Sequence, residues 1–172
     1  MPPDSAYVGL GSNLGDRAGN LLLAVREMMN AGVRVARLSS VYETAPVDVL
    51  EQPMFLNMVA EIEGVNMSPE QLLGRLLKIE YALGRRRDVP RGARTIDLDL
   101  LTFGDATCAT EFLTLPHPRL HLRRFVLTPL AELAPDKLHP TLRRTYSEML
   151  ATTPDDSDVR LWQPQGGMRA EG

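Results

Sequence analysis

Several features are scarce in this sequence of 172 residues, and each scarcity excludes a class of protein. There is one cysteine, Cys108, so the chain cannot form an internal disulfide or a cysteine-only metal cluster. No apolar run approaches the roughly 20 residues that a membrane helix needs. Aromatic residues make up only 5% and the formal net charge is −3, which argues against a surface that coats nucleic acid. The first residues enter a strand without the apolar segment of a signal peptide, so we expect a cytoplasmic protein that binds neither membrane nor nucleic acid.

The remaining composition is that of a globular domain, with 44% hydrophobic and 24% charged residues. Apolar periodicity and turn residues predict alternating strands and helices. The strands are expected at residues 7–11, 33–44, 55–63 and 94–104, the helices at 16–31 and 68–83, and short helices at 128–134 and 142–151.

The order strand, helix, strand, strand, helix, strand is typical of a split βαβ fold. We therefore predict an α+β class with a ferredoxin-like, mostly antiparallel sheet. Helices would cover one face and leave the other free for function, and a C-terminal hairpin and short helices would follow. Residues 1–151 would form the single domain and residues 152–172 a loosely ordered tail.

Two aspartates interrupt the apolar strand in "RTIDLDLLTFG". Because side chains alternate along a strand, Asp97 and Asp99 point to one face, and Ile96, Leu98 and Leu100 point to the helices. Their Cα atoms would lie roughly 7 Å apart. At that distance two carboxylates repel by about 0.6 kcal/mol in water and by about 2.4 kcal/mol at an effective dielectric of 20. A solvated pair is the common explanation of such a motif, but a half-enclosed pair needs cations and suits Mg²⁺.

Five arginines precede this strand, and they include Arg85, Arg87, Arg91 and Arg94. A run of charge is most often a solvated loop. Here it joins a helix to the acidic strand, and guanidinium groups match phosphate oxygens. Carboxylates for a metal beside arginines for phosphate favour a nucleoside triphosphate ligand, although no Walker-type sequence is present.

Three further residues and one turn give weaker indications of function. Glu80 lies in the last turn of its helix, where the helix dipole disfavours an anion, so it marks either a functional site or a salt bridge to Arg85 or Arg87. Phe55 and Asn57 share the open face of their strand, a ring and an amide that suit a flat heteroaromatic ligand. The turn "GLGSNLGD" lacks the third glycine of a dinucleotide motif and favours a tight turn instead.

Together, "GLGSNLGDR", "SSVYETAPV", "QPMFLNMV", "RGARTIDLDLLTFG" and "LTLPHPRLHLRRFVLTPLAELAP" resemble the 6-hydroxymethyl-7,8-dihydropterin pyrophosphokinase family of folate biosynthesis. The resemblance runs from about residue 7 to residue 140. It implies a diphosphokinase that transfers pyrophosphate from ATP to 6-hydroxymethyl-7,8-dihydropterin and releases AMP. We expect a monomer, although the sequence does not give the oligomeric state.

The resemblance also implies a role for each matching residue. Asp97 and Asp99 would hold two Mg²⁺ ions, and Arg85 and Arg94 would neutralise the transferred phosphates. The triphosphate would contact Arg87, Thr114, His117 and Arg123, and the nucleoside would contact Glu80 and the backbone near Leu100. The pterin would be bound by Thr44, Val47, Phe55, Asn57 and Phe125.

The chain departs from the family at Leu77, Arg91 and Phe112, where some members have Gln, Trp and Arg. Two other classes share parts of the pattern. A two-aspartate polymerase or cyclase would need a long basic groove, which the sequence lacks. An RNA-recognition domain would need an aromatic strand motif that is absent.

Overall fold

The computed structural model describes residues 5–45, 52–84 and 95–164, and every structural statement below concerns these residues. Its main sheet has the strand order β5-β1-β4-β3-β8, and β2 also pairs with β4. Each of these pairings is antiparallel. The strands are β1 (Ser5–Ser12), β2 (Val35–Leu38), β3 (Tyr42–Thr44), β4 (Phe55–Glu63), β5 (Asp97–Phe103) and β8 (Val159–Leu161). The predicted extended segment 33–44 is thus two strands rather than one.

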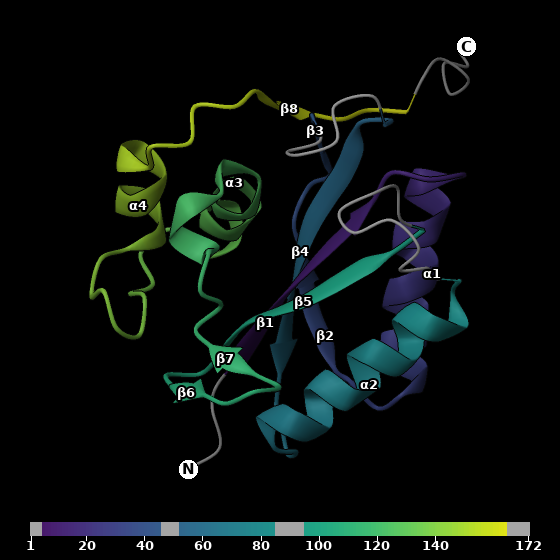
Figure 1. Ribbon diagram of the computed structural model, residues 1–172, viewed down its shortest axis with the longest axis horizontal. Helices are drawn as coiled ribbons and strands as arrows, with labels where there is room; N and C mark the ends of the chain where they lie inside the picture. The colour runs from purple at the N-terminus through teal and green to yellow at the C-terminus, as the bar shows by residue number, and fades with distance from the viewer. Residues whose placement is uncertain (1–4, 46–51, 85–94, 165–172) are drawn as a thin grey trace.

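Two long helices, α1 (Arg17–Asn30) and α2 (Pro69–Ala82), cover one face of the sheet (Figure 1). The Asp16 carboxylate caps α1 by accepting the Gly19 N–H. Ser68 and Gln71 form the predicted capping box at the start of α2. Ile96, Leu98 and Leu100 join the hydrophobic core under these helices, which confirms the predicted alternation along the acidic strand.

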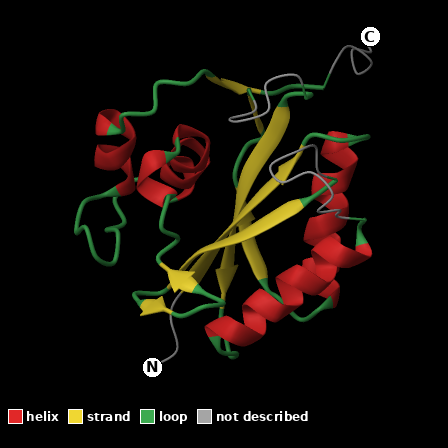
Figure 2. Cartoon of the chain, in the orientation of Figure 1, coloured by secondary structure: helices red, strands yellow, loops and turns green. Residues whose placement is uncertain are grey.

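The opposite face carries two further helices, α3 (Arg124–Leu133) and α4 (Tyr146–Thr152) (Figure 2). A second hydrophobic cluster joins them to the sheet through Tyr7, Val59 and Leu101. The prediction that helices cover only one face, with the other left free, is therefore wrong for this part of the sheet. On this face, the part of the sheet that α3 and α4 leave uncovered lies beside the start of α3.

The connection between β5 and α3 contains the predicted hairpin, β6 (Cys108–Ala109) paired with β7 (Thr114–Leu115), and a short 3-10 helix at Leu120–Leu122. Both short helices differ from their predicted bounds. α3 begins at Arg124 rather than 128, and α4 begins at Tyr146 rather than 142 because Thr145 and Glu148 form its capping box.

The chain after α4 contributes a sixth strand to the sheet. β8 pairs with β3, and the Trp162 N–H donates to the carbonyl of Val41 over 2.8 Å. The prediction of a loosely ordered tail is therefore wrong for residues 159–161. In the part of the chain that the structure describes, none of the helices combines the length and apolar character required to cross a membrane.

Candidate active site

Glycine forms the floor of the site, in the middle of the sheet. Gly11 of β1 pairs with Asp97 on one side and with Asn57 on the other, and Gly9 pairs with Asp99 and Val59. Residues paired across antiparallel strands project to the same face. Because neighbouring strands are about 4.8 Å apart and the middle position lacks a side chain, Asp97 and Asn57 face each other across a trough.

A cavity of about 600 Å³ lies above this floor. Its lining includes both aspartates, the predicted pterin residues Thr44, Phe55, Asn57 and Phe125, and Arg123 of the predicted triphosphate group. Asp97 and Asp99 are partly exposed, as a metal-binding pair must be. The structure therefore brings together the acidic pair and the aromatic and amide groups, although they come from four separate stretches of sequence.

The wall of the cavity opposite the aspartates is formed by β3, β4 and α3. Asn57 Nδ2 donates to Thr44 Oγ1 over 2.8 Å, and both residues are buried. This bond fixes the amide and leaves its oxygen beside Gly11. Phe125, at the start of α3, has the Arg123 guanidinium carbon 5.5 Å from its ring centre. The wall thus carries an oriented amide, Asn57, and two aromatic residues, Phe55 and Phe125.

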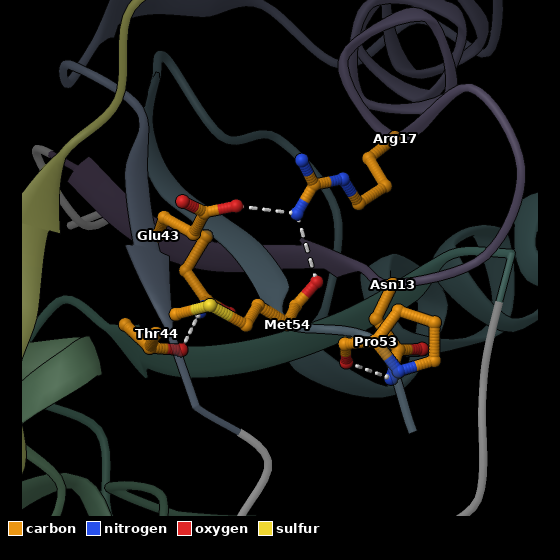
Figure 3. Close-up of polar contacts among 7 residues, drawn as sticks. Asn13, Arg17, Glu43, Thr44, Pro53 and Met54 are labelled. Carbon is orange, nitrogen blue, oxygen red and sulfur yellow. Dashed lines mark hydrogen bonds and ion pairs between the residues drawn. The ribbon is translucent and has the colours of Figure 1, made fainter. Parts of the chain in front are cut away.

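One rim of the cavity is held by polar contacts from Asn13, just after β1, and from Arg17, the first residue of α1 (Figure 3). Arg17 forms an ion pair with Glu43 at 2.7 Å and donates to the Met54 carbonyl at 3.0 Å. The amide of Asn13, which is fully buried, donates to Gln52 Oε1 and to the Pro53 carbonyl. Asn13 and Arg17 therefore anchor the chain that leads into β4.

Glu80 is buried, with 3% of its surface exposed. Its Oε2 accepts the backbone N–H of Leu98 over 2.6 Å. Leu98 lies between the two aspartates, on the outer edge of β5, so Glu80 fixes α2 to the strand at the acidic pair. The salt bridge to Arg85 or Arg87 that we considered lies outside the described residues.

Fewer of the residues predicted to bind ATP line the cavity than of the residues predicted to bind the pterin. Among the described residues, Glu80, Leu100, Thr114 and His117 do not line the cavity. The His117 N–H donates to the carbonyl of Leu101, so His117 lies beside β5 below the aspartates. Arg85, Arg87, Arg94 and Val47 lie outside the described residues. The roles of these residues stay predictions.

The cavity lining also includes Arg119, Leu122, Asp155 and Ser157, which the sequence did not indicate as site residues. Arg119 and Leu122 belong to the quoted motif "LPHPRLHLRRF", which could have indicated them. Asp155 and Ser157 come from the segment that we predicted to be a loose tail. Nothing in their local sequence indicates a contact with the cavity.

A methyl group at Gly11 would lie 2.9 Å from Asn57 Oδ1, which is closer than a carbon and an oxygen atom normally pack. We expect Gly11→Ala to displace the Asn57 amide. Pterin binding should weaken by about tenfold or more, because one oriented hydrogen bond to the ring would be lost. Gly9→Ala is the matched control, because its methyl group meets only the Leu101 side chain at 3.6 Å. Equilibrium titration with the fluorescent pterin measures the affinity of both variants. Equal pterin affinities of Gly11→Ala and Gly9→Ala would contradict the prediction.

Burial, followed by the charges of Arg123 and Arg119, lowers the pKa of His117 to about 4. In the unfolded chain the His117 imidazole takes up a proton near pH 6.5. In the folded chain it does so only near its lowered pKa of about 4. Stability is therefore lost as pH falls from 6.5 towards 4. At pH 5.5 this costs about 1 kcal/mol relative to pH 7.5. Urea unfolding of the wild type and His117→Gln should show a smaller loss in the variant, and parallel profiles would refute this role.

Known proteins match this chain over most of its length. The 7,8-dihydro-6-hydroxymethylpterin-pyrophosphokinase (HPPK) family matches residues 7–135. The 2-amino-4-hydroxy-6-hydroxymethyldihydropteridine pyrophosphokinase of Bacillus subtilis is 42% identical over 164 residues, which cover 95% of this chain and 93% of that protein. The enzyme of the same name from Methylorubrum extorquens is 45% identical over 132 residues, 76% of this chain and 83% of that protein.

Longer proteins also contain a matching region. The mitochondrial folate synthesis bifunctional protein of Arabidopsis thaliana is 44% identical over 127 residues, which cover 73% of this chain but 23% of that protein. A crystal structure of an HPPK-DHPS in complex with substrates shares the fold, with a TM-score of 0.71 at 14% identity, over 88% of this chain and 43% of that chain. The family match, the long relatives of high identity and the shared fold agree, so this chain belongs to the 7,8-dihydro-6-hydroxymethylpterin-pyrophosphokinase family.

Proposed function

We propose that the chain transfers pyrophosphate from ATP to 6-hydroxymethyl-7,8-dihydropterin in folate synthesis, with the cavity above Gly9 and Gly11 as its active site. Family membership gives the reaction. The observation that carries the assignment to this cavity is the row Asp97, Gly11, Asn57 across three strands. It sets a carboxylate pair and a fixed amide on opposite sides of one trough.

The acidic side of the cavity suits Mg²⁺. Asp97 and Asp99 would offer carboxylate oxygens to a metal ion on one face. The described residues contain no group of three or more His, Cys, Asp or Glu side chains that could hold a metal ion. A pair of carboxylates that leaves the other positions to water and phosphate oxygens is the usual Mg²⁺ arrangement beside ATP. Two bound Mg²⁺ ions would neutralise the phosphates and make the pterin hydroxyl easier to deprotonate.

Residues of the chain would position the ATP phosphates and neutralise their charge. The hydroxymethyl oxygen would attack the β-phosphorus in line, and AMP would leave. Arg123 reaches the cavity from the start of α3 and would contact the triphosphate, together with Arg87, Thr114 and His117. Arg85 and Arg94 would stabilise the charge on the transferred group. Glu80 and the backbone at Leu100 would contact the nucleoside at the edge of β5.

The opposite side of the cavity would bind the pterin. Phe55 and Phe125 would stack on the two faces of the ring, and Asn57, held by Thr44, would form hydrogen bonds with its edge. Backbone groups at Thr44 and Val47 would hold the same ring. The strand order is compatible with the ferredoxin-like arrangement. We also retain the expectation of a monomer, which sedimentation analysis would test.

The experiment is a product analysis. The protein is incubated with ATP and Mg²⁺, with and without the pterin, and the nucleotides are separated by chromatography. We expect AMP that forms only when the pterin is present. ADP as the product, or AMP at an equal rate without pterin, would overturn the proposal.

A further inference from the structure

The first turn of α3 is not capped by the side chain of its own N-cap residue. Its N-cap position is occupied by Arg123, whose side chain forms no capping bond. The first backbone N–H groups of a helix need acceptors from outside the helix. Asp155, 31 residues further along the chain, meets this need, because its Oδ2 accepts the Arg124 N–H over 2.7 Å. The cap of α3 is therefore supplied by a distant segment.

The Asp155 carboxylate is itself held in place. Its Oδ1 accepts the Ser157 N–H over 3.0 Å, so both oxygens have a backbone donor. Burial disfavours the charged form of Asp155, but the Arg124 and Ser157 amides outweigh it and lower the pKa of the carboxyl. A carboxylate at a helix N-terminus is also favoured by the helix dipole.

The segment that carries Asp155 is attached at both ends. The Thr153 hydroxyl donates to the His121 carbonyl over 3.2 Å, ahead of α3. Beyond Asp155, β8 pairs with β3, with Val159 opposite Thr44. In Figure 1 this segment runs from α4 past α3 to β8. It thus connects two parts of the wall opposite the aspartates, the start of α3 and β3, whose Thr44 holds Asn57.

We propose that Asp155 is a positioning residue for pterin binding, which holds the first turn of α3 and with it Phe125 against the cavity. Asp155 and Ser157 line the cavity themselves, so the segment also closes its side. This inference rests on the proposed function, since it takes Phe125 as a pterin contact.

The rest of α3 has separate attachments, so loss of the cap should loosen only its first turn. Glu132 accepts hydrogen bonds from the Ser40 N–H, the Ser40 hydroxyl and the Tyr42 hydroxyl. Arg37 donates to the Leu133 carbonyl over 2.8 Å. These contacts fix the far end of the helix to β2, β3 and the turn between them.

The experiment compares Asp155→Ala, Asp155→Asn and Asp156→Ala in the full chain. Asn retains a capping oxygen, and Asp156 is an exposed neighbour of the same charge. For Asp155→Ala we expect the KM for pterin to rise by about threefold to thirtyfold, the range given by loss of an N-cap, with kcat within about twofold. Asp155→Asn should recover most of the affinity, and Asp156→Ala should match the wild type.

Amide hydrogen exchange gives a readout that does not depend on the assignment of Phe125. Exchange at Arg124 should accelerate in Asp155→Ala and not at Leu130 or Leu133. A pterin KM equal to that of Asp156→Ala, or an Asn variant as impaired as the Ala variant, would overturn the inference. Unchanged pterin affinity in Phe125→Ala would instead contradict the proposed pterin site, while accelerated exchange at Arg124 would still show the cap.

Discussion

Replacing Asp97 or Asp99 by alanine should lower kcat by at least about a thousandfold, while pterin affinity stays within about twofold of the wild type. The two carboxylates would hold the ions that neutralise the triphosphate, a contribution of several kcal/mol, and each 1.4 kcal/mol is about tenfold in rate. The proposed pterin contacts lie across the glycine floor, on β4 and α3, so they should not depend on the acidic pair.

The measurement is steady-state turnover at saturating ATP and Mg²⁺, with pterin affinity measured separately by fluorescence titration without nucleotide. Asp136→Ala is the matched control, since Asp136 is exposed and does not line the cavity. Both aspartates are partly exposed on the sheet surface, so neither change should unfold the protein. Turnover near that of Asp136→Ala in either variant would refute the metal role.

Substitution of Asn57 by leucine should give the second large effect, a rise of about a hundredfold in the KM for pterin. Leucine has the same number and branching of side-chain heavy atoms but offers no donor or acceptor, so the polar edge of the pterin ring would be buried without partners. Each such unpaired group costs about 1–3 kcal/mol. The fold should tolerate the change, because the Asn57 side chain faces the cavity and not the core under α1 and α2.

Two further variants show whether the amide acts through its orientation. Thr44→Val removes the hydroxyl that accepts from Asn57 Nδ2 and should give an intermediate rise in the KM for pterin, because the amide remains but is no longer fixed. Asn66→Leu, at an exposed loop position, should have no effect. If the KM for pterin in Asn57→Leu stays within about threefold of the Asn66→Leu value, the amide does not recognise the ring.

Local sequence rules predicted the parts of this fold that depend on neighbouring residues. Alternation placed Asp97 and Asp99 on one face and Leu98 and Leu100 on the other, and the structure has them so. The capping box of Ser68 and Gln71 fixed the start of α2. The division of β4 into an apolar face and a face with Phe55 and Asn57 is confirmed in the same way.

The predictions that failed depend on contacts between distant residues. The start of α3 was placed four residues late because its capping carboxylate, Asp155, lies 31 residues away, and Arg123 gives no local start signal. Residues 159–161 look like a loose tail because a three-residue strand has little signal until β3 pairs with it. The second helical layer on the sheet was missed because Tyr7, Val59 and Leu101 belong to strands whose partners the sequence does not reveal.

The central claim is that both terminal phosphates of ATP move together to the pterin. The direct test uses ATP labelled with ³²P at the β-phosphorus, Mg²⁺ and 6-hydroxymethyl-7,8-dihydropterin, with separation of all products. If pyrophosphate is transferred, the label appears in the pterin diphosphate and the AMP is unlabelled. Label in ADP would show transfer of the γ-phosphoryl group alone, label in free pyrophosphate would show hydrolysis, and either result would contradict the account.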